Sequence, residues 1–289
     1  MVSYILGEYL AAKGRLSRQQ LQEIWKAQDE VRVKLGLIAV SEGMLTVEQA
    51  DEINRLQAVQ DKRFGDIAKE KGYLTEEQLN KLLALQGNEY LSFIQSLVNA
   101  NLFSMETADK ILWEYCRDNG FSLSQMEALK NGDTDSILPL YLPSGGSAHQ
   151  EIIGIAIRTI IRCIDRHVSI EKAQIVSGME QTAAVLQKLT GQSPLTTGFL
   201  EGDTGLLSLA SVFGREEFSQ LDEDALDSAG EFLNCVNGLY AAAMSEQGIT
   251  LELTPPDYYA DGTALTGDTI CLVPLRIENK KLYFVIMEN

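Results

Sequence analysis

Hydrophobic and polar positions in the first part of the chain recur with a constant period of 29 residues. Each unit contains two glycines, then a leucine two places after the second glycine, then a Ser or Thr. The recurring positions are Gly7, Gly36 and Gly65, then Gly14, Gly43 and Gly72, and finally Gln28, Gln57 and Gln86, which close the three units. A fixed period of this length is typical of stacked helical repeats.

One unit, residues 34–57, predicts a pair of helices. A short helix ends at Gly43, because glycine readily adopts the left-handed conformation that follows a helix. Thr46 then caps a second, amphipathic helix. After Ser17 and Thr75, a Gln stands at the third helical position, an arrangement that suits a reciprocal capping box.

A fourth and degenerate copy follows the three units. Asn101 takes the glycine position, Ser104 takes the cap, and Tyr115 takes the closing position. Residues 1–117 are therefore expected to form an all-helical domain of helix pairs.

The next segment, residues 118–147, differs in character from the repeats. It contains Asn-Gly twice, an acidic polar run, and the sequence Pro-Ser-Gly-Gly-Ser at 143–147. Such residues favour turns and irregular structure, so this segment is predicted to be a linker.

Beyond the linker, residues 148–289 predict a domain of mixed α and β structure. Residues 149–165 carry the broad apolar face of a helix. Strands are expected at 169–176, 182–189 and 206–209, and a hairpin is expected from 269–277 and 281–287.

A longer amphipathic helix is predicted from about Asp222 to Glu246. Acidic residues cluster at its start, where the helix dipole favours them, and Gly248 follows its end. Its predicted buried stripe consists of Leu226, Phe232 or Leu233, Val236, Leu239 or Tyr240, and Ala243.

A second face of this helix carries Asp227, Glu231, Asn234 and Gly238 within an arc of about 60°. Asn and Gly in a helix interior each cost up to about 1 kcal/mol relative to Ala. Their presence fits a face that another molecule approaches closely. The plainer interpretation, a solvated helix surface, stays open from the pattern alone.

Composition supports two globular domains that are both acidic but differ in how strongly they are charged. Of the 289 residues, 45% are hydrophobic and 22% are charged, which is the balance of a folded soluble protein. The net charge of −17 argues against a nucleic-acid binder, because phosphate contacts need a basic face. Residues 1–117 contain 14 Lys and Arg against 17 Asp and Glu, and residues 118–289 contain 10 against 24.

Patterns for membrane insertion, export or metal binding are missing from the sequence. No apolar run approaches the roughly 18 residues of a membrane span, and the N-terminus lacks the pattern of a signal peptide, so a cytoplasmic protein is expected. The four cysteines are far apart and form no CxxC pair. They are expected to be reduced, mostly buried thiols, with no metal site.

The N-terminal units resemble the MshEN domain of type II secretion and pilus ATPases. Some members of that family bind cyclic di-GMP, so the resemblance implies candidate nucleotide-binding positions. These are Arg63, Gly65, Gly72 and Gln86 in the third unit, and Lys34, Gly36, Gly43 and Gln57 in the second. Two other interpretations stay open: the glycines and glutamines only shape helix ends, or the repeats dock a protein.

The pattern Asp227-x3-Glu231-x2-Asn234-x3-Gly238 resembles the signature helix of the CheC, CheX and FliY phosphatases of chemotaxis. The resemblance extends over about residues 148–289 and implies an α/β domain with a mainly antiparallel sheet and long helices. It implies hydrolysis of the phosphoaspartate of a CheY-like response regulator, with Asn234 orienting the attacking water. Glu231 would pair with a lysine of the regulator, and Asp227 and Gly238 would support the motif.

The same resemblance implies a homodimer and no cofactor in this chain, with Mg²⁺ supplied by the phosphorylated partner. One active site is expected, because Gly154 stands where a second active helix would need Asn. The helical repeats would then regulate or target the phosphatase.

Two alternative functions remain. One is a catalytically silent adaptor that binds a receiver domain or a copy of itself. The other is a cyclic di-GMP receptor, for which Arg63 and Lys34 would converge on one exposed pocket.

Overall fold

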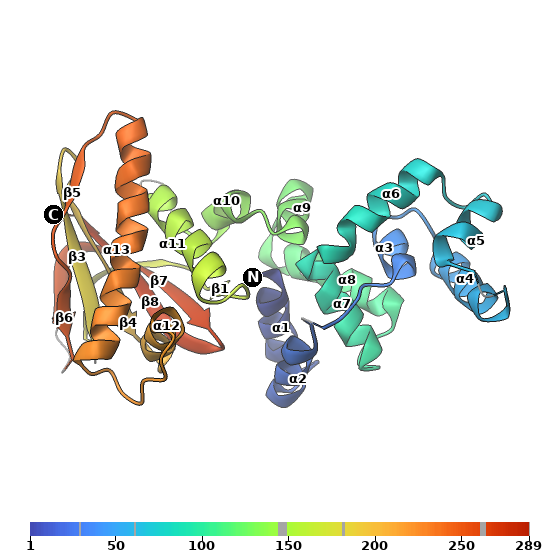
Figure 1. The fold of residues 1–289 in the computed structure, drawn as a ribbon, viewed down its shortest axis with the longest axis horizontal. Coiled ribbons are helices and arrows are strands. Elements are labelled where there is room, and N and C mark those ends of the chain that lie inside the picture. The colour runs from blue at the N-terminus through green and yellow to red at the C-terminus, as the bar shows by residue number, and fades with distance from the viewer. Residues whose placement is uncertain (29, 61, 144–148, 181–182, 261–263, 289) are drawn as a thin grey trace. The chain divides into compact units, whose positions relative to one another are not determined.

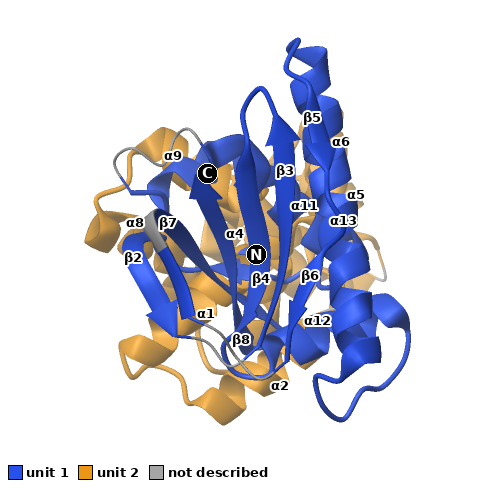
Figure 2. Ribbon diagram, turned by 90° about the vertical axis from the view of Figure 1, so that its left-hand side faces the viewer, with its two compact units in different colours: residues 1, 134–289 blue, residues 2–133 orange. Residues whose placement is uncertain are grey.

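The computed structural model describes residues 1–28, 30–60, 62–143, 149–180, 183–260 and 264–288. It contains two compact units, residues 2–133 and residues 134–289 together with Met1 (Figure 2). The division lies inside the segment predicted to be a linker, of which residues 144–147 are outside the described ranges. The expected combination of an all-helical part and an α/β part with an antiparallel sheet is confirmed.

Paired helices make up most of the first unit, as the 29-residue period predicts (Figure 1). The pairs are α1 (Val2–Ala12) with α2 (Arg18–Gln28), α3 (Leu35–Ser41) with α4 (Val47–Gln60), α5 (Phe64–Glu70) with α6 (Glu76–Ala84), and α7 (Glu89–Asn99) with α8 (Met105–Asn119). A 3₁₀ turn, η1 (Leu85–Gly87), precedes α7, and α9 (Leu123–Asn131) follows α8.

The second glycine of each unit follows the end of a helix. The backbone is left-handed at Gly43 (φ 65°) and Gly72 (φ 70°), a conformation that residues with a Cβ rarely adopt. Asn101 has φ 57° at the same position of the fourth copy, and Asn is one of the few other residues that tolerate this conformation. The predicted helix ends, including the one in the degenerate copy, are confirmed.

The first glycine of a unit has a different physical role. A Cβ added to Gly65 would lie 2.7 Å from Leu79 Cδ2, and one added to Gly7 would lie 2.8 Å from Trp25 Cζ2. Glycine at this position therefore allows side chains of the second helix in a pair to pack against the backbone of the first.

Predicted capping boxes open the second helices of the pairs. Gln78 N donates to Thr75 Oγ1 over 3.2 Å, and Thr75 N donates to Gln78 Oε1 over 2.9 Å. Ser17 and Gln20 make the same two bonds. Two amides that have no partner within the helix are satisfied at each of these helix starts.

The segment predicted to be a linker contains helices instead, namely α9 and α10 (Thr134–Ile137). The two Asn-Gly pairs that suggested turns are helix ends, since Gly120 and Gly132 have φ 71° and 69°. Ser122 opens α9 with a capping box, and the helix packs against α7 and α8. Asn and Gly are favoured both at helix ends and in turns, so the two Asn-Gly pairs did not reveal the helices beside them.

An antiparallel sheet forms the framework of the second unit. Its strands are β1 (Ser169–Ile170), β2 (Gln174–Glu180), β3 (Ala184–Gly191), β4 (Leu195–Glu201), β5 (Leu251–Leu253), β6 (Asp257–Tyr259), β7 (Ala264–Ile277) and β8 (Lys280–Glu288). The order is β1-β7-β8-β4-β3-β5, while β2 also pairs with β7 and β6 with β3. The predicted hairpin corresponds to β7 and β8.

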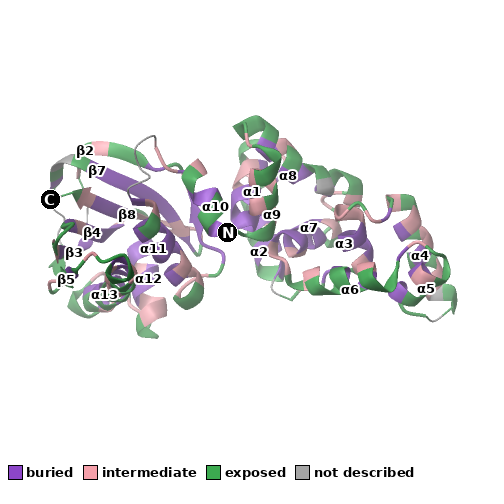
Figure 3. Ribbon diagram, turned by 90° about the horizontal axis from the view of Figure 1, so that it is seen from above, coloured by how far each residue is buried: buried purple, intermediate pink, exposed green. Residues whose placement is uncertain are grey.

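Three helices cover one face of this sheet: α11 (Gln150–Cys163), α12 (Gly205–Gly214) and α13 (Glu223–Glu246) (Figure 2). The core between them contains Phe199 of β4, whose ring lies 5.7 Å from that of Phe232 in α13 and 5.1 Å from that of Phe284 in β8. Strands β7 and β8 are buried along much of their length (Figure 3). No helix in the described ranges is long and apolar enough to cross a membrane.

Residues 206–209 belong to α12, so the predicted strand there is wrong. A short apolar run does not distinguish a buried strand from a buried helix. The carboxylate of Glu201 accepts hydrogen bonds from the amides of Gly202, Gly205 and Leu207, which supplies partners for the start of the helix. The preceding strand β4 was not predicted.

Replacing Gly65 by Ala is expected to destabilise the protein, although Ala in a helix is normally about 1 kcal/mol more favourable than Gly. Overpacking against Leu79 costs roughly 1–3 kcal/mol, so the midpoint of urea unfolding should fall. Gly87→Ala is the matched control, because a Cβ there would meet no atom within 4 Å. In a Leu79→Ala background the effect of Gly65→Ala should disappear, and its persistence would contradict the packing explanation.

Candidate functional site

Helix α13 turns its predicted apolar stripe toward the sheet. Asp222 caps the helix, with Oδ1 accepting from Ala225 N over 3.1 Å. The sequence left open whether Leu239 or Tyr240 belongs to this stripe. Tyr240 is buried and Leu239 is 44% exposed, so the stripe contains Tyr240. The large buried side chains of the helix are Leu226, Phe232, Leu233, Val236, Tyr240 and Met244.

The four motif residues lie on the outward side of α13. Asp227, Glu231 and Asn234 are exposed, and Gly238 is partly exposed. A Cβ added to Gly238 would meet no atom of another element within 4 Å, so packing in the described residues does not require glycine there. This face therefore has room for close contact with another molecule.

Asp227 accepts a hydrogen bond of 3.0 Å from the hydroxyl of Tyr258 in β6. The Tyr258 ring packs over α13 at Gly230, where an added Cβ would lie 2.6 Å from Tyr258 Cε1. Burial and the hydrogen bond to Asp227 raise the pKa of Tyr258 to about 12, so the phenol remains a donor at neutral pH. Asp227 thus anchors β6 beside the motif, a contact that sequence reasoning missed.

The Asn234 side chain is held by the core although it lies at the surface. Its Oδ1 accepts a hydrogen bond of 2.8 Å from Gln187 Nε2, and Gln187 is 0% exposed in β3. Sequence reasoning missed Gln187. The sequence feature that could have revealed it is a polar residue two positions from both Val185 and Leu189. Residues two apart in a strand share one face, and Val185 and Leu189 are buried.

Glu231 lies one helical turn from Asn234 on the same face. Within the part of the chain that the structure describes, no cation forms an ion pair with Glu231. Its carboxylate is therefore available to a positively charged group of another molecule.

Cys235 lies beside the motif residues on α13. Burial, followed by the charges of Glu231 and Cys163, raises the pKa of Cys235, which disfavours the nucleophilic thiolate. The expectation of mostly buried cysteines holds for Cys116 and Cys271, whereas Cys163 and Cys235 are exposed. Among the described residues, no group of three or more His, Cys, Asp or Glu could hold a metal ion.

Helix α11 has Glu151 and Gly154 at the spacing that Glu231 and Asn234 have in α13. Glu151 accepts hydrogen bonds of 3.0 and 3.2 Å from Gln247 Nε2, so its carboxylate is engaged within the unit. Gly154 is buried, and an added Cβ would lie 3.0 Å from Arg158 Nη1. A single active face, on α13, stays the prediction.

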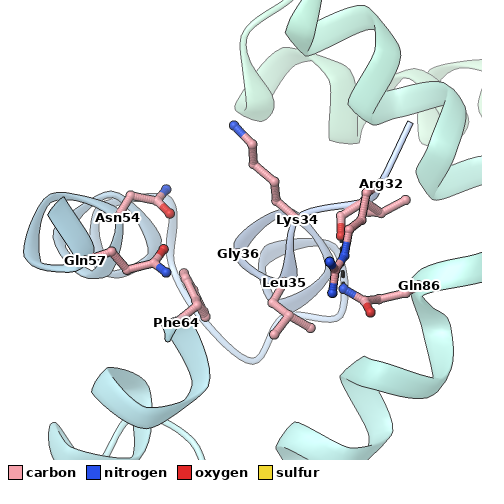
Figure 4. Close-up of a pocket in the computed structure, with 9 residues that line it drawn as sticks. Arg32, Lys34, Leu35, Gly36, Asn54, Gln57, Phe64 and Gln86 are labelled. Atoms are coloured by element: carbon pink, nitrogen blue, oxygen red, sulfur yellow. Dashed lines mark hydrogen bonds between the residues drawn. The ribbon is translucent and has the colours of Figure 1, made fainter. Parts of the chain in front are cut away.

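A cavity of about 610 Å³ lies in the second and third helical repeats (Figure 4). Figure 4 shows Asn54, Gln57 and Phe64 on one side, with Arg32 and Gln86 on the other. Exposed cations, polar amides and an aromatic ring are the groups that recognise an anionic ligand with a planar base. The full lining consists of Arg32, Val33, Lys34, Leu35, Gly36, Asn54, Gln57, Phe64 and Gln86.

Four of the eight predicted nucleotide-binding residues line the cavity, namely Lys34, Gly36, Gln57 and Gln86. Arg63, Gly65, Gly43 and Gly72 are not among its lining residues. Arg63 therefore does not converge with Lys34 on this cavity, and the cation that lines it beside Lys34 is Arg32. Sequence reasoning passed over Arg32 because it stands outside the repeat motif.

The glutamines of the cavity also support the local structure. Gln86 Nε2 donates to Val33 O over 3.2 Å, and Gln57 Nε2 donates to Lys62 O over 3.4 Å. These bonds agree with the interpretation in which the glutamines stabilise the chain between helices, and they leave the amide oxygens for other partners.

Comparison with known proteins finds no matching family model and no matching curated protein. Solved structures that resemble part of the chain include CheX from Desulfovibrio desulfuricans, with 12% identity over 48% of this chain and 96% of that one, at a TM-score of 0.42. A CheC-like protein from Shewanella oneidensis has 14% identity over 50% and 100%, at a TM-score of 0.44. The CheX–CheY–BeF3–Mg complex from Borrelia burgdorferi has 15% identity over 48% and 96%, at 0.38. At these values, the function has to be argued from the residues of this chain.

Two glycines of α13 should respond in opposite ways to replacement by Ala. Gly238→Ala is expected to raise the free energy of unfolding by several tenths to about 1 kcal/mol, because the helix gains propensity and nothing clashes. Gly230→Ala should lower it, because the new Cβ would lie 2.6 Å from the Tyr258 ring. Urea unfolding of the full chain measures both, and a destabilising Gly238→Ala would show that glycine is needed there for folding.

Proposed function

We propose that the second unit hydrolyses the phosphoaspartate of a response-regulator receiver domain. The observation that carries the proposal is the outward face of α13. There a surface amide, Asn234, is held in place by Gln187, and Glu231, one turn away, has no ion-pair partner in the described residues. The resemblance of the Asp227-to-Gly238 pattern to the signature helix of the CheC, CheX and FliY phosphatases adds the reaction class.

The reaction demands little covalent chemistry from the enzyme. Water attacks phosphorus in line, the bond between phosphorus and the aspartyl oxygen breaks, and the products are inorganic phosphate and a free carboxylate. Positioning of the water is therefore the main source of rate enhancement. Mg²⁺ bound by the receiver neutralises charge on the phosphoryl oxygens.

In this proposal Asn234 orients the attacking water. Its amide carries two N–H donors and an oxygen with two lone pairs, so it can bind water and a phosphoryl oxygen at once. The amide needs no shifted pKa, because the proton of the water leaves with the phosphate product.

Glu231 docks the receiver through its active-site lysine. The ion pair forms as the two surfaces lose water, which strengthens it relative to an exposed pair. Gly238 leaves space for the partner backbone, and Asp227 supports β6 through Tyr258. The helical repeats are proposed to regulate or target this activity, and the homodimer stays a prediction.

Loss of acyl phosphate from a panel of phosphorylated receiver domains tests the proposal. Asn234→Ala is expected to lower kcat about 10²-fold with little change in KM, because the water loses its orientation. Glu231→Gln is expected to raise KM roughly tenfold, because the docking ion pair is lost.

Glu246→Gln is the matched control, since Glu246 is an exposed carboxylate about four turns further along α13. Its kinetics should equal those of the wild type. Binding of a receiver by the wild type without faster loss of phosphate would favour the adaptor interpretation. An Asn234→Ala protein as active as the wild type would remove Asn234 from the mechanism.

A second candidate function, binding of cyclic di-GMP by the helical repeats, is favoured by the cavity beside Arg32 and Lys34. The phosphates would meet these cations, and a guanine would stack on Phe64. A Cβ at Gly36 would lie 3.1 Å from Phe64 Cε2, so glycine keeps this ring close to the helix backbone.

Titration calorimetry of the full chain with cyclic di-GMP tests this candidate. Arg32→Ala should weaken binding by roughly tenfold through loss of a charge-assisted hydrogen bond, whereas Arg63→Ala should leave it unchanged. Arg63 is the matched control because it is exposed nearby but does not line the cavity. If Arg63→Ala weakened binding and Arg32→Ala did not, the ligand would bind outside this cavity. If the wild type gave no heat of binding, the protein would not be a cyclic di-GMP receptor.

A further inference from the structure

A buried chain of polar side chains runs from the sheet to the surface amide of Asn234. Thr197 Oγ1 donates to Asn237 Oδ1 over 2.9 Å, and Asn237 Nδ2 donates to Gln187 Oε1 over 2.7 Å. Gln187 Nε2 donates to Asn234 Oδ1 and to the backbone oxygen of Thr254, each over 2.8 Å. Every amide group of Gln187 therefore has a partner.

This chain lies in an interface that is otherwise apolar. Thr197, Gln187 and Asn237 are each 0% exposed, and they come from β4, β3 and α13. Burying such groups is unfavourable unless all of them are hydrogen-bonded, and a set of apolar side chains at these three positions would carry no such requirement. The presence of three polar side chains at these buried positions therefore suggests a role other than filling the core.

The direction of the hydrogen bonds follows from one backbone group. The Thr254 carbonyl can only accept, so it requires the NH₂ of Gln187 on its side. The second hydrogen of that NH₂ points to Asn234, which must present its oxygen. The oxygen of Gln187 then faces Asn237, which must donate.

We propose that Gln187 is a positioning residue that sets the rotamer and the amide orientation of Asn234 before the receiver binds. An exposed Asn samples several rotamers and a broad range of χ2 angles. The bond from Gln187 restricts this range, directs Oδ1 toward the core, and leaves the NH₂ and one lone pair of Oδ1 for water and phosphate. The inference rests on the proposed phosphatase function, because it assigns the cause of Asn234 alignment in that reaction.

Gln187→Met tests the inference with a side chain of similar length and no donor. The expected result is a fall in kcat of roughly tenfold with unchanged KM, because the docking groups stay in place while Asn234 loses its restraint. The side-chain ¹⁵N order parameter of Asn234, assigned by its disappearance in Asn234→Asp, should fall at the same time. Thr197→Val is the matched control, since it removes a buried hydrogen bond at the far end of the chain.

The order parameter of Asn234 in the wild-type protein also tests the inference, and this measurement does not depend on whether a variant folds. A value for Asn234 near that of the buried Asn237 supports the inference, whereas a value near that of the exposed Asn80 overturns it. A folded Gln187→Met protein with wild-type kcat and order parameter also overturns it. Failure of the wild type to dephosphorylate any receiver defeats the proposed function, and the order parameter still decides whether Gln187 restrains Asn234.

Discussion

Burial of one face of α13 against the sheet is the constraint on which the second unit depends. Phe232 of this helix contacts Phe199 of β4, with ring centroids 5.7 Å apart, and Phe213 of α12, with centroids 5.3 Å apart. Because side chains on a helix recur every 3.6 residues, holding one face inward sets the other face outward. Glu231 and Asn234 are exposed for this reason, on a rigid element suited to a functional site.

The polar chain beneath Asn234 joins stability to the site. Gln187 and Asn237 are buried among apolar side chains, where a satisfied network specifies one arrangement of helix and sheet more strongly than apolar contacts do. The same bonds restrain a side chain on the outer surface of the helix. A change that loosens the core here therefore acts on the exposed face as well.

Glycine has three distinct physical roles in this chain. Gly72 has a left-handed backbone, Gly65 allows a neighbouring helix to approach, and Gly238 faces open space. The first two roles concern folding of the repeats. The third has no folding explanation in the described residues, which is why Gly238 belongs to the candidate interface.

The sequence by itself determined the features that depend on neighbouring residues: the 29-residue helix pairs, the capping boxes, and the amphipathic helix whose one face carries Glu231 and Asn234. Helix α9 and helix α12 were missed because their signals, an Asn-Gly pair and a short apolar run, serve turns and strands equally well. Only the tertiary structure decided that Gln187 holds Asn234, across 47 positions of sequence, and that Tyr258 meets Asp227, across 31. Such contacts arise from the packing of α13 on the sheet, and no local periodicity encodes which distant side chains that packing brings together.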